Sequence, residues 1–250
     1  MGRTRFLKYA RLEAHGGSSG HPFDLPVVGW LTCHRELAFP GGATFVVGEN
    51  GSGKSALVEA VAVAASFNPE GGSRNFRFAT RSTESSLGDR LVLGWGPAKP
   101  RTGFFLRAES YYNVATKIER LDRIGSPLLP AYGGTSPHDR SHGESFLDLV
   151  THRFGPHGLY LLDEPEAALS VRACMAVLAR LAELLERNCQ FLIATHSPIL
   201  LALPGATILE IGDDGAITRV SYDDALPVRL TREFLAAPER LLRILLDDEV

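Results

Sequence analysis

The chain has 250 residues, of which 44% are hydrophobic and 22% charged, and its formal net charge is −3. These values are typical of a globular protein with one large domain, and the charge gives no overall reason to expect nucleic-acid binding. The three cysteines have neither the paired spacing of a zinc site nor the even number of a disulfide framework. The sequence shows no signal-peptide core and no apolar run long enough to cross a bilayer. We therefore expect a cytoplasmic protein whose residues 1–250 form a single domain.

In the first half of the chain, short apolar runs and one Ala/Val-rich stretch predict strands that alternate with helices. We expect strands at 5–12, 27–31, 44–47 and 102–106, helices at 54–66 and 110–121, hairpins between 70 and 107, and a Pro/Gly/Ser-rich linker at 125–140.

The second half of the chain has clearer periodicity. We expect buried strands at 159–162 and 190–194, a long helix at 166–186, a hairpin formed by 207–211 and 216–220, and an amphipathic helix at 229–246 that is broken near Pro238. Continuous apolar strands that alternate with helices indicate an α/β fold with a mostly parallel sheet covered on both faces.

A glycine-rich loop stands between the predicted strand at 44–47 and the predicted helix at 54–66. It fits the phosphate-binding pattern G-x-x-x-x-G-K-[ST] with Gly48, Glu49, Asn50, Gly51, Ser52, Gly53, Lys54 and Ser55. In such a loop the backbone amides surround the phosphates, Lys54 reaches the β- and γ-phosphates, and the Ser55 hydroxyl binds Mg²⁺. The alternative is a chance glycine turn before a helix. The full match in its strand–loop–helix context predicts binding of ATP with Mg²⁺.

Two acidic residues, Asp163 and Glu164, follow the apolar strand at 159–162. Open α/β sheets bind their ligands at the carboxyl ends of their strands, so we expect Asp163 to bind Mg²⁺. Glu164 is then placed to orient or deprotonate the attacking water. The alternative is an acidic N-cap before Pro165.

One strand later, His196 follows the apolar run at 190–194, where a side chain could reach the γ-phosphate of a nucleotide at the same sheet edge. Considered alone, it is more often a loop or capping residue.

The pentapeptide Ser141-His142-Gly143-Glu144-Ser145 precedes another apolar helix. It fits a capping box, in which Ser141 and Glu144 satisfy free backbone amides. The alternative is an exposed helix N-terminus that binds phosphate, and the pentapeptide taken alone favours the capping box.

The order GENGSGKS, SHGES, LYLLDEPEAAL and IATHSP resembles the ATPase domain of the ABC superfamily between about residues 44 and 203. The resemblance implies a P-loop fold with an N-terminal antiparallel β region and a small helical subdomain at 107–158. It also implies that Ser141, Gly143 and Glu144 contact the γ-phosphate bound to the opposite subunit of a head-to-tail homodimer. It further implies that 166–169 communicates across that dimer and that His196 is the family's switch histidine.

The sequence departs from the family pattern in two places. His142 replaces a signature glycine, and the glutamine expected before the signature is missing, because the only glutamine of the chain is Gln190. Glu109 stands near the expected place and offers oxygen ligands to Mg²⁺. The alternative for Glu109 is an acid favoured by a helix N-terminus.

The segment from Tyr160 onward is similar to non-transport ATPases of the SMC, RecF and overcoming-lysogenization-defect type, many of which act in DNA repair or phage defence. We therefore predict an ATP-hydrolysing enzyme that dimerises on ATP and drives an unidentified effector protein. Basic residues between 74 and 107 leave a nucleic-acid clamp with little turnover as the alternative. Tyr9 and Trp30 are candidates for stacking on adenine, and each fits a packing role as well.

Overall fold

The structure is a computed structural model that describes residues 5–13, 20–34, 36–73, 87–108, 116, 122 and 142–247. The strands are β1 (Leu7–Leu12), β2 (Leu37–Ala38), β3 (Ala43–Gly48), β4 (Leu91–Trp95), β5 (Thr102–Arg107), β6 (Gly158–Asp163), β7 (Gln190–Ala194), β8 (Thr207–Ile211) and β9 (Ile217–Val220). The helices are α1 (Pro26–Cys33), α2 (Lys54–Ala64), α4 (His142–Asp148), α5 (Val171–Glu186), α6 (Pro198–Leu201), α7 (Leu226–Ala236) and α8 (Pro238–Asp247). Short 3₁₀ helices lie at Gly88–Arg90 and Pro165–Ala168, and a π-helical turn lies at Leu149–Arg153.

The larger sheet has the strand order β5-β6-β7-β3-β8-β9, and every pair in it is parallel except β8 with β9. Ala194 of β7 is aligned with Val46 of β3 on one side and with Asp163 of β6 on the other. The carboxyl ends of three neighbouring strands therefore meet at one edge of the sheet. The predicted α/β fold with a mostly parallel sheet is confirmed.

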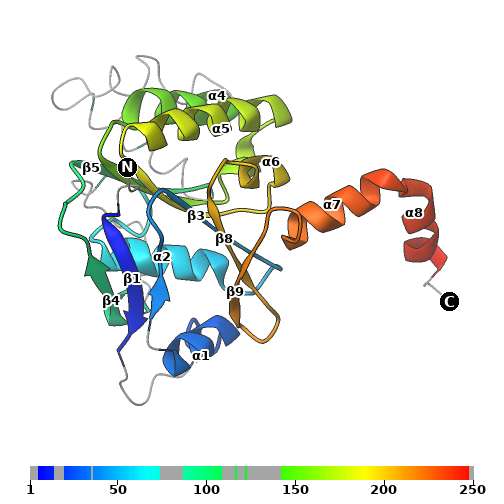
Figure 1. Ribbon diagram of the computed structural model, residues 1–250, viewed down its shortest axis with the longest axis horizontal. Coiled ribbons are helices and arrows are strands. Elements are labelled where there is room, and N and C mark those ends of the chain that lie inside the picture. The colour runs from blue at the N-terminus through cyan, green and yellow to red at the C-terminus, as the bar shows by residue number, and fades with distance from the viewer. Residues whose placement is uncertain are drawn as a thin grey trace.

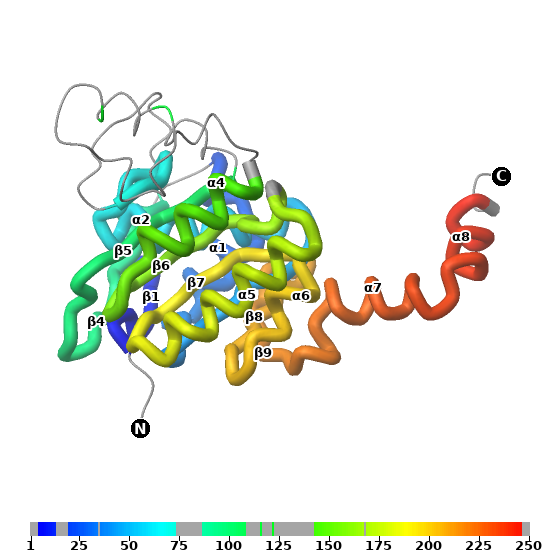
Figure 2. The backbone as a smooth tube through the Cα atoms, turned by 90° about the horizontal axis from the view of Figure 1, so that it is seen from above, coloured from blue at the N-terminus to red at the C-terminus, as the bar shows by residue number. Residues whose placement is uncertain are grey.

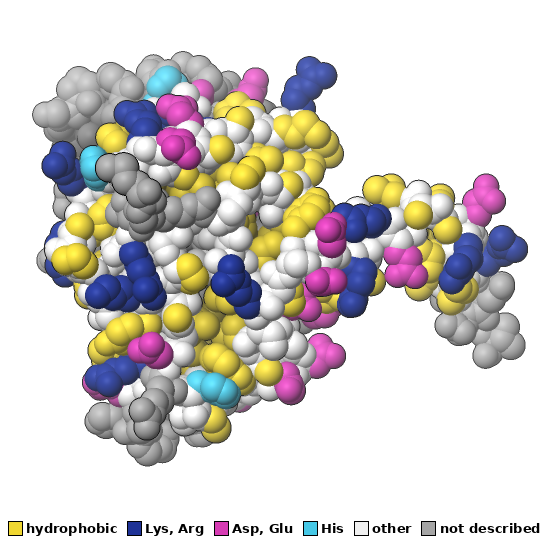
Figure 3. Space-filling view, viewed as in Figure 1, with side chains coloured by type: hydrophobic (Ala, Val, Ile, Leu, Met, Phe, Trp, Pro, Cys, Tyr) yellow, Lys and Arg dark blue, Asp and Glu magenta, His cyan; other side chains and the backbone are white. Residues whose placement is uncertain are grey.

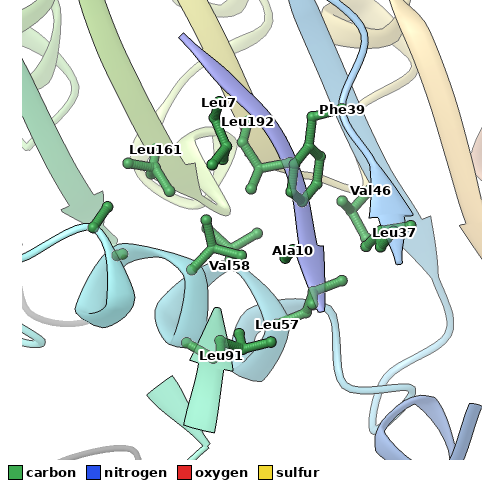
Figure 4. Close-up of a cluster of buried hydrophobic side chains, with 14 of the residues drawn as sticks. Leu7, Ala10, Leu37, Phe39, Val46, Leu57, Val58, Leu91, Leu161 and Leu192 are labelled. Carbon is green, nitrogen blue, oxygen red and sulfur yellow. The ribbon is translucent and has the colours of Figure 1, made fainter. Parts of the chain in front are cut away.

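Side chains of the larger sheet alternate between two apolar cores, because successive residues of a strand point to opposite faces. Phe45 and Val47 pack in the core beneath α4, α5 and α6, whereas Val46 packs against α2 and the smaller sheet. Figure 1 shows α4 and α5 on one side of the sheet and α2 with β1 and β4 on the other. Figure 4 shows Leu57 and Val58 of α2 among the side chains of this second core.

The smaller sheet is antiparallel, with the order β2-β1-β4, as predicted for the N-terminal region. Buried Gln190, at the start of β7, joins it to the larger sheet. The Gln190 side-chain oxygen accepts hydrogen bonds from the backbone N–H groups of Phe6 (2.7 Å) and Leu7 (2.8 Å), and its amide donates to the Leu7 carbonyl (2.8 Å). A single polar side chain thus fixes the position of β1 on the main body.

Two predictions about secondary structure are wrong. The expected strand at 27–31 is part of α1, because Pro26 fits a first helical position and Val27, Val28 and Leu31 are buried at helical spacing. The expected helix at 166–186 is interrupted, because Ser170 caps a new helix by accepting from the Ala173 N–H. Part of the region 70–107, for which hairpins are predicted, lies outside the described residues, and within the described part β4 pairs with β1, distant in sequence.

The helices α7 and α8 form a C-terminal arm that projects away from the rest of the molecule (Figure 2). The predicted break near Pro238 is confirmed, since α8 starts at that residue. Within the described residues, no helix is both long and apolar enough to cross a membrane. The predicted helix at 110–121 and the linker at 125–140 lie outside those residues, apart from the isolated position 116.

Candidate nucleotide-binding site

The predicted phosphate loop connects β3 to α2, and its glycines allow a tight turn. Gly51 and Gly53 have φ angles of 82° and 95°, in the left-handed region that favours glycine. A Cβ on Gly53 would also lie 2.5 Å from a methyl carbon of Val27 in α1. A Cβ on Gly48 would lie 2.8 Å from the Ser52 hydroxyl oxygen. The loop therefore has the backbone shape that its sequence predicts.

Lys54 begins α2 and is only 4% exposed. Its ammonium donates to the Glu49 carbonyl at 2.9 Å, so the side chain folds back over the loop. Burial lowers the pKa of Lys54, while the nearby carboxylates of Glu164 and Asp163 oppose that shift by favouring the charged form. A buried cation above a ring of backbone amides is suited to bind an anion.

Asp163 ends β6 and is 5% exposed. In the sheet register it lies beside Arg107, the last residue of β5, and its carboxylate is 3.6 Å from the Arg107 Nε. The Arg107 guanidinium also pairs with Glu59 of α2 at 2.5 Å. These three charged side chains, the Arg107 cluster, connect two strand ends to the helix that follows the phosphate loop.

Glu164 has a φ of 49°, an uncommon conformation for a residue other than glycine and one found often at functional sites. Its side chain is 42% exposed, and its Oε1 lies 3.8 Å from the His196 Nε2. The backbone N–H of His196 donates to the Glu166 carboxylate. The structure thus brings together the two predicted catalytic residues and shows that Glu166 holds the backbone beside them.

A cavity of about 250 Å³ lies at this edge of the sheet. It is lined by His21, Leu25, Asn50, Gly51, Gly53, Lys54, Ser55, Ala56, Glu59, Arg107 and Glu164. Six of these are residues that the sequence singled out for nucleotide binding or catalysis. His21, Leu25, Ala56, Glu59 and Arg107 were not predicted as site residues from the sequence. The available signal for Arg107 was its place directly after the predicted apolar strand at 102–106.

Ser55 and Asp163 are the residues that could hold Mg²⁺, because a hydroxyl and a buried carboxylate are hard oxygen ligands. No group of three or more His, Cys, Asp or Glu side chains suited to a metal ion occurs in the part of the chain that the structure describes.

Of the signature residues, Gly143 and Glu144 are described by the structure, and neither lines this cavity. Gly143 and Glu144 lie in the first turn of α4, and Glu144 is exposed. Ser141 and Glu109 lie outside the described residues.

The two candidates for adenine stacking do not line the cavity either. Tyr9 lies in β1, and its ring covers Gly94 of β4. Trp30 lies in α1, and its ring stacks on His34 with the two ring centroids 3.8 Å apart. Both residues therefore make packing contacts within the chain.

Two protein-family models match the sequence. Residues 29–117 match a family described as "AAA domain", and residues 95–202 match one described as "AAA domain, putative AbiEii toxin, Type IV TA system". Neither match covers half of the chain, and together they span residues 29–202. The phosphate loop, Asp163, Glu164 and His196 all fall within this span.

Several solved structures with ATP-binding domains are similar to this chain. The SMC head domain from Thermotoga maritima has 18% identity and a TM-score of 0.45, over 86% of this chain and 99% of that one. A nucleotide-free ATP-binding cassette from an ABC transporter has 14% identity and a TM-score of 0.47, over 94% and 96% of the two chains. An inward-facing putative metal-chelate type ABC transporter has 16% identity and a TM-score of 0.48, over 88% and 84%. None of the curated proteins matches the sequence.

Proposed function

We propose that this chain binds ATP with Mg²⁺ in the cavity at the sheet edge and hydrolyses the γ-phosphate. The observation that carries the proposal is that Glu164 lines the same cavity as Lys54 and Ser55, although it is distant from them in the sequence. His196 supports it, since its ring lies 3.8 Å from the Glu164 carboxylate.

Each side chain has a role that follows from its position. Lys54 and the loop amides bind the phosphates, and the Lys54 charge stabilises the negative charge that develops during transfer. Glu164 orients and deprotonates the attacking water, and His196 holds the carboxylate or contacts the γ-phosphate. Bound Mg²⁺, held by Ser55 and Asp163, would neutralise phosphate charge. Glu109 remains a candidate additional ligand.

The proposal includes a head-to-tail homodimer formed on ATP. Gly143 and Glu144 stand at the start of α4 and do not line the cavity of their own chain, which is consistent with contact to the nucleotide of a second chain. Together with Ser141 they would close the site over the γ-phosphate. The cycle of closing and opening would then drive an effector protein. The proposed setting is DNA repair or phage defence, and one matching family is described as a putative toxin of a type IV TA system.

The test uses two variants and one control. Lys54→Ala should abolish ATP binding in a calorimetric titration, and Glu164→Gln should bind ATP but hydrolyse it at least about a hundredfold more slowly, consistent with the usual contribution of a general base. Lys99→Ala removes an exposed lysine outside the cavity and should change neither property. Unchanged ATP affinity in Lys54→Ala would refute the proposed site.

The second candidate function is a nucleic-acid clamp, suggested by basic residues between 74 and 107. Three of these residues in the described part make internal contacts: Arg90 lies over the Phe23 ring, Lys99 over the Trp95 ring, and Arg107 pairs with Glu59. Arg74, Arg77 and Arg81 lie outside the described residues. A steep decrease of DNA or RNA affinity with salt would favour the clamp, because phosphate contacts release counterions.

A further inference from the structure

Glu164 and His196, the two residues proposed to act in hydrolysis, follow neighbouring strands of the larger sheet. Asp163 at the end of β6 is aligned with Ala194 at the end of β7. The two side chains therefore stand on adjacent turns, where Glu164 Oε1 lies 3.8 Å from His196 Nε2. Two turns that share one reaction have to be held in register, because a displacement of about 1 Å can slow catalysis about a hundredfold.

Two hydrogen bonds join these turns, one in each direction. The backbone N–H of Glu164 donates to the Ala194 carbonyl at 3.0 Å. In the other direction, the backbone N–H of His196 donates to Oε1 of Glu166 at 2.5 Å. The first bond is made by the backbone alone and is open to any sequence, whereas the second needs an acceptor on one particular side chain. Glu166 thus attaches the turn that carries His196 to the turn after β6.

The neighbouring amides at the exit of β7 have other acceptors. The Thr195 N–H donates to the Val46 carbonyl of β3 at 3.2 Å, and the Ser197 N–H donates to the Thr195 hydroxyl at 3.0 Å. Neither bond reaches the turn after β6. Loss of the Glu166 acceptor would therefore release the N–H of His196 and leave the bonds on either side of it in place.

Stability alone does not account for an acidic residue at position 166. The second oxygen of Glu166, Oε2, is buried and has no hydrogen-bond partner in the part of the chain that the structure describes. A buried carboxylate oxygen without a donor is destabilising, and proteins retain such groups at functional sites. Burial lowers the pKa of Lys54, and Glu166 is among the carboxylates that oppose this shift, so its charge acts at the nucleotide site.

We propose that Glu166 is a positioning residue for ATP hydrolysis, whose carboxylate fixes the His196 backbone and so keeps the His196 ring beside Glu164. The inference rests on the proposed function, in which Glu164 and His196 act at the γ-phosphate. Glu166 does not line the nucleotide cavity, so it acts through His196. The contact lies within one chain and is separate from the communication across a dimer that the family resemblance implies for 166–169.

The first test needs no nucleotide and measures hydrogen exchange of the His196 amide by nuclear magnetic resonance. Exchange should be at least about tenfold faster in Glu166→Ala than in the wild type, because the N–H loses its acceptor. Glu166→Gln keeps an acceptor oxygen at the same reach and should keep the protection. Glu166→Asp keeps the charge but is one methylene shorter and should lose the protection.

The matched control removes a glutamate far from the site. Glu239 is exposed at the start of α8, in the C-terminal arm. Figure 3 shows acidic side chains on this arm, which projects from the body of the molecule. Glu239→Ala should change neither the exchange of the His196 amide nor hydrolysis.

The second test measures kcat and ATP affinity for the same variants. Glu166→Ala and Glu166→Asp should lower kcat about ten- to a hundredfold with ATP affinity unchanged, since the phosphate loop is intact. Glu166→Gln should stay within about threefold of the wild type, because a neutral acceptor makes a weaker hydrogen bond than a charged one. In a His196→Ala background, Glu166→Ala should cause no further loss, because a residue that acts through the ring has no effect without it.

Three results would overturn the inference in a wild type that hydrolyses ATP. They are unchanged exchange or unchanged kcat in Glu166→Ala, additive losses from Glu166→Ala and His196→Ala, and activity that is kept by Glu166→Asp but lost in Glu166→Gln. If Glu166→Ala does not fold, the pair Glu166→Gln and Glu166→Asp gives the same comparison. A wild type that binds ATP without hydrolysing it would instead refute the proposed function, on which the inference rests.

Discussion

Three charged residues of the nucleotide site are largely buried next to one another, and each charge is stabilised by the opposite charge beside it. Arg107 is only 23% exposed, and it lies between Glu59, 13% exposed, and Asp163, 7% exposed by side chain. Removing one member of a poorly solvated ion cluster is costly, because the remaining charges are left uncompensated. The proposed Mg²⁺ would add positive charge at the same place as Arg107.

We therefore predict that Arg107→Ala lowers the free energy of unfolding by about 2–4 kcal/mol when Mg²⁺ is absent. Millimolar Mg²⁺ should restore part of that loss, since the cation replaces the missing charge beside Asp163 and Glu59. Thermal unfolding with EDTA and with Mg²⁺ measures both effects. Arg107→Lys, which keeps the charge, is the control, and an equal Mg²⁺ response in wild type and Arg107→Ala would contradict the prediction.

At the scale of whole elements, the described structure depends on how the two sheets are joined. Gln190 of β7 makes three buried hydrogen bonds to Phe6 and Leu7, so one side chain satisfies two N–H groups and one carbonyl of β1. Apolar packing alone holds two sheets together without fixing their register, whereas these bonds do fix it.

Gln190→Met should lower the free energy of unfolding by about 2–5 kcal/mol, because it keeps the size of the side chain but leaves buried backbone groups without partners. Urea denaturation measures the loss. ATP binding should persist under native conditions, since Gln190 does not line the nucleotide cavity. A loss below about 1 kcal/mol would show that water or another group replaces the side chain.

Tyr160 of β6 gives a pH-dependent prediction for the core beneath α5. Its hydroxyl donates to the Gly155 carbonyl and accepts from the Gly155 N–H, both at 2.7 Å, and its ring stacks on Phe154. Burial raises the pKa of Tyr160 to about 12 from an ordinary value of 10.0. The folded state therefore holds this proton more tightly than the unfolded state, and its stabilising effect is lost as the pH rises from 10 towards 12.

Because of this group, the free energy of unfolding should be about 1.4 kcal/mol lower at about pH 11 than at about pH 9. Tyr160→Phe should be less stable than wild type at neutral pH, because it loses two hydrogen bonds, but it should lose less stability over the alkaline range. Chemical denaturation at both ends of that range measures the difference. Parallel decreases in the two proteins would mean that Tyr160 does not cause the alkaline loss.

At the scale of the whole molecule, the proposed ATP site is completed by a second chain. The described signature residues Gly143 and Glu144 do not line the cavity of their own chain, so the oligomeric state is the property that tests this contact.

Glu164→Gln should form a dimer with ATP and Mg²⁺ but not with ADP, because the variant keeps the phosphate contacts and removes the base. Light scattering measures the mass. Adding Ser141→Arg should return the protein to a monomer without weakening ATP binding, since the bulky side chain would stand at the helix start that meets the γ-phosphate of the second chain. A Glu164→Gln protein that remains monomeric in saturating ATP would contradict the dimer mechanism but not the ATP site.

The sequence by itself determined the sheet class and the main strands, because apolar runs and glycine signals are local. It also predicted Lys54, Ser55 and Glu164, since their motifs follow from the chemistry of phosphate binding, and the structure places these three around one cavity. Only the tertiary structure decided that 27–31 is helical, where Pro26 and the packing against Gly53 override strand propensity. The tertiary structure also showed that Arg107 forms a cluster with Glu59 and Asp163, and that the C-terminal arm is exposed. Those features depend on which distant segments come into contact, and local sequence patterns do not contain that information.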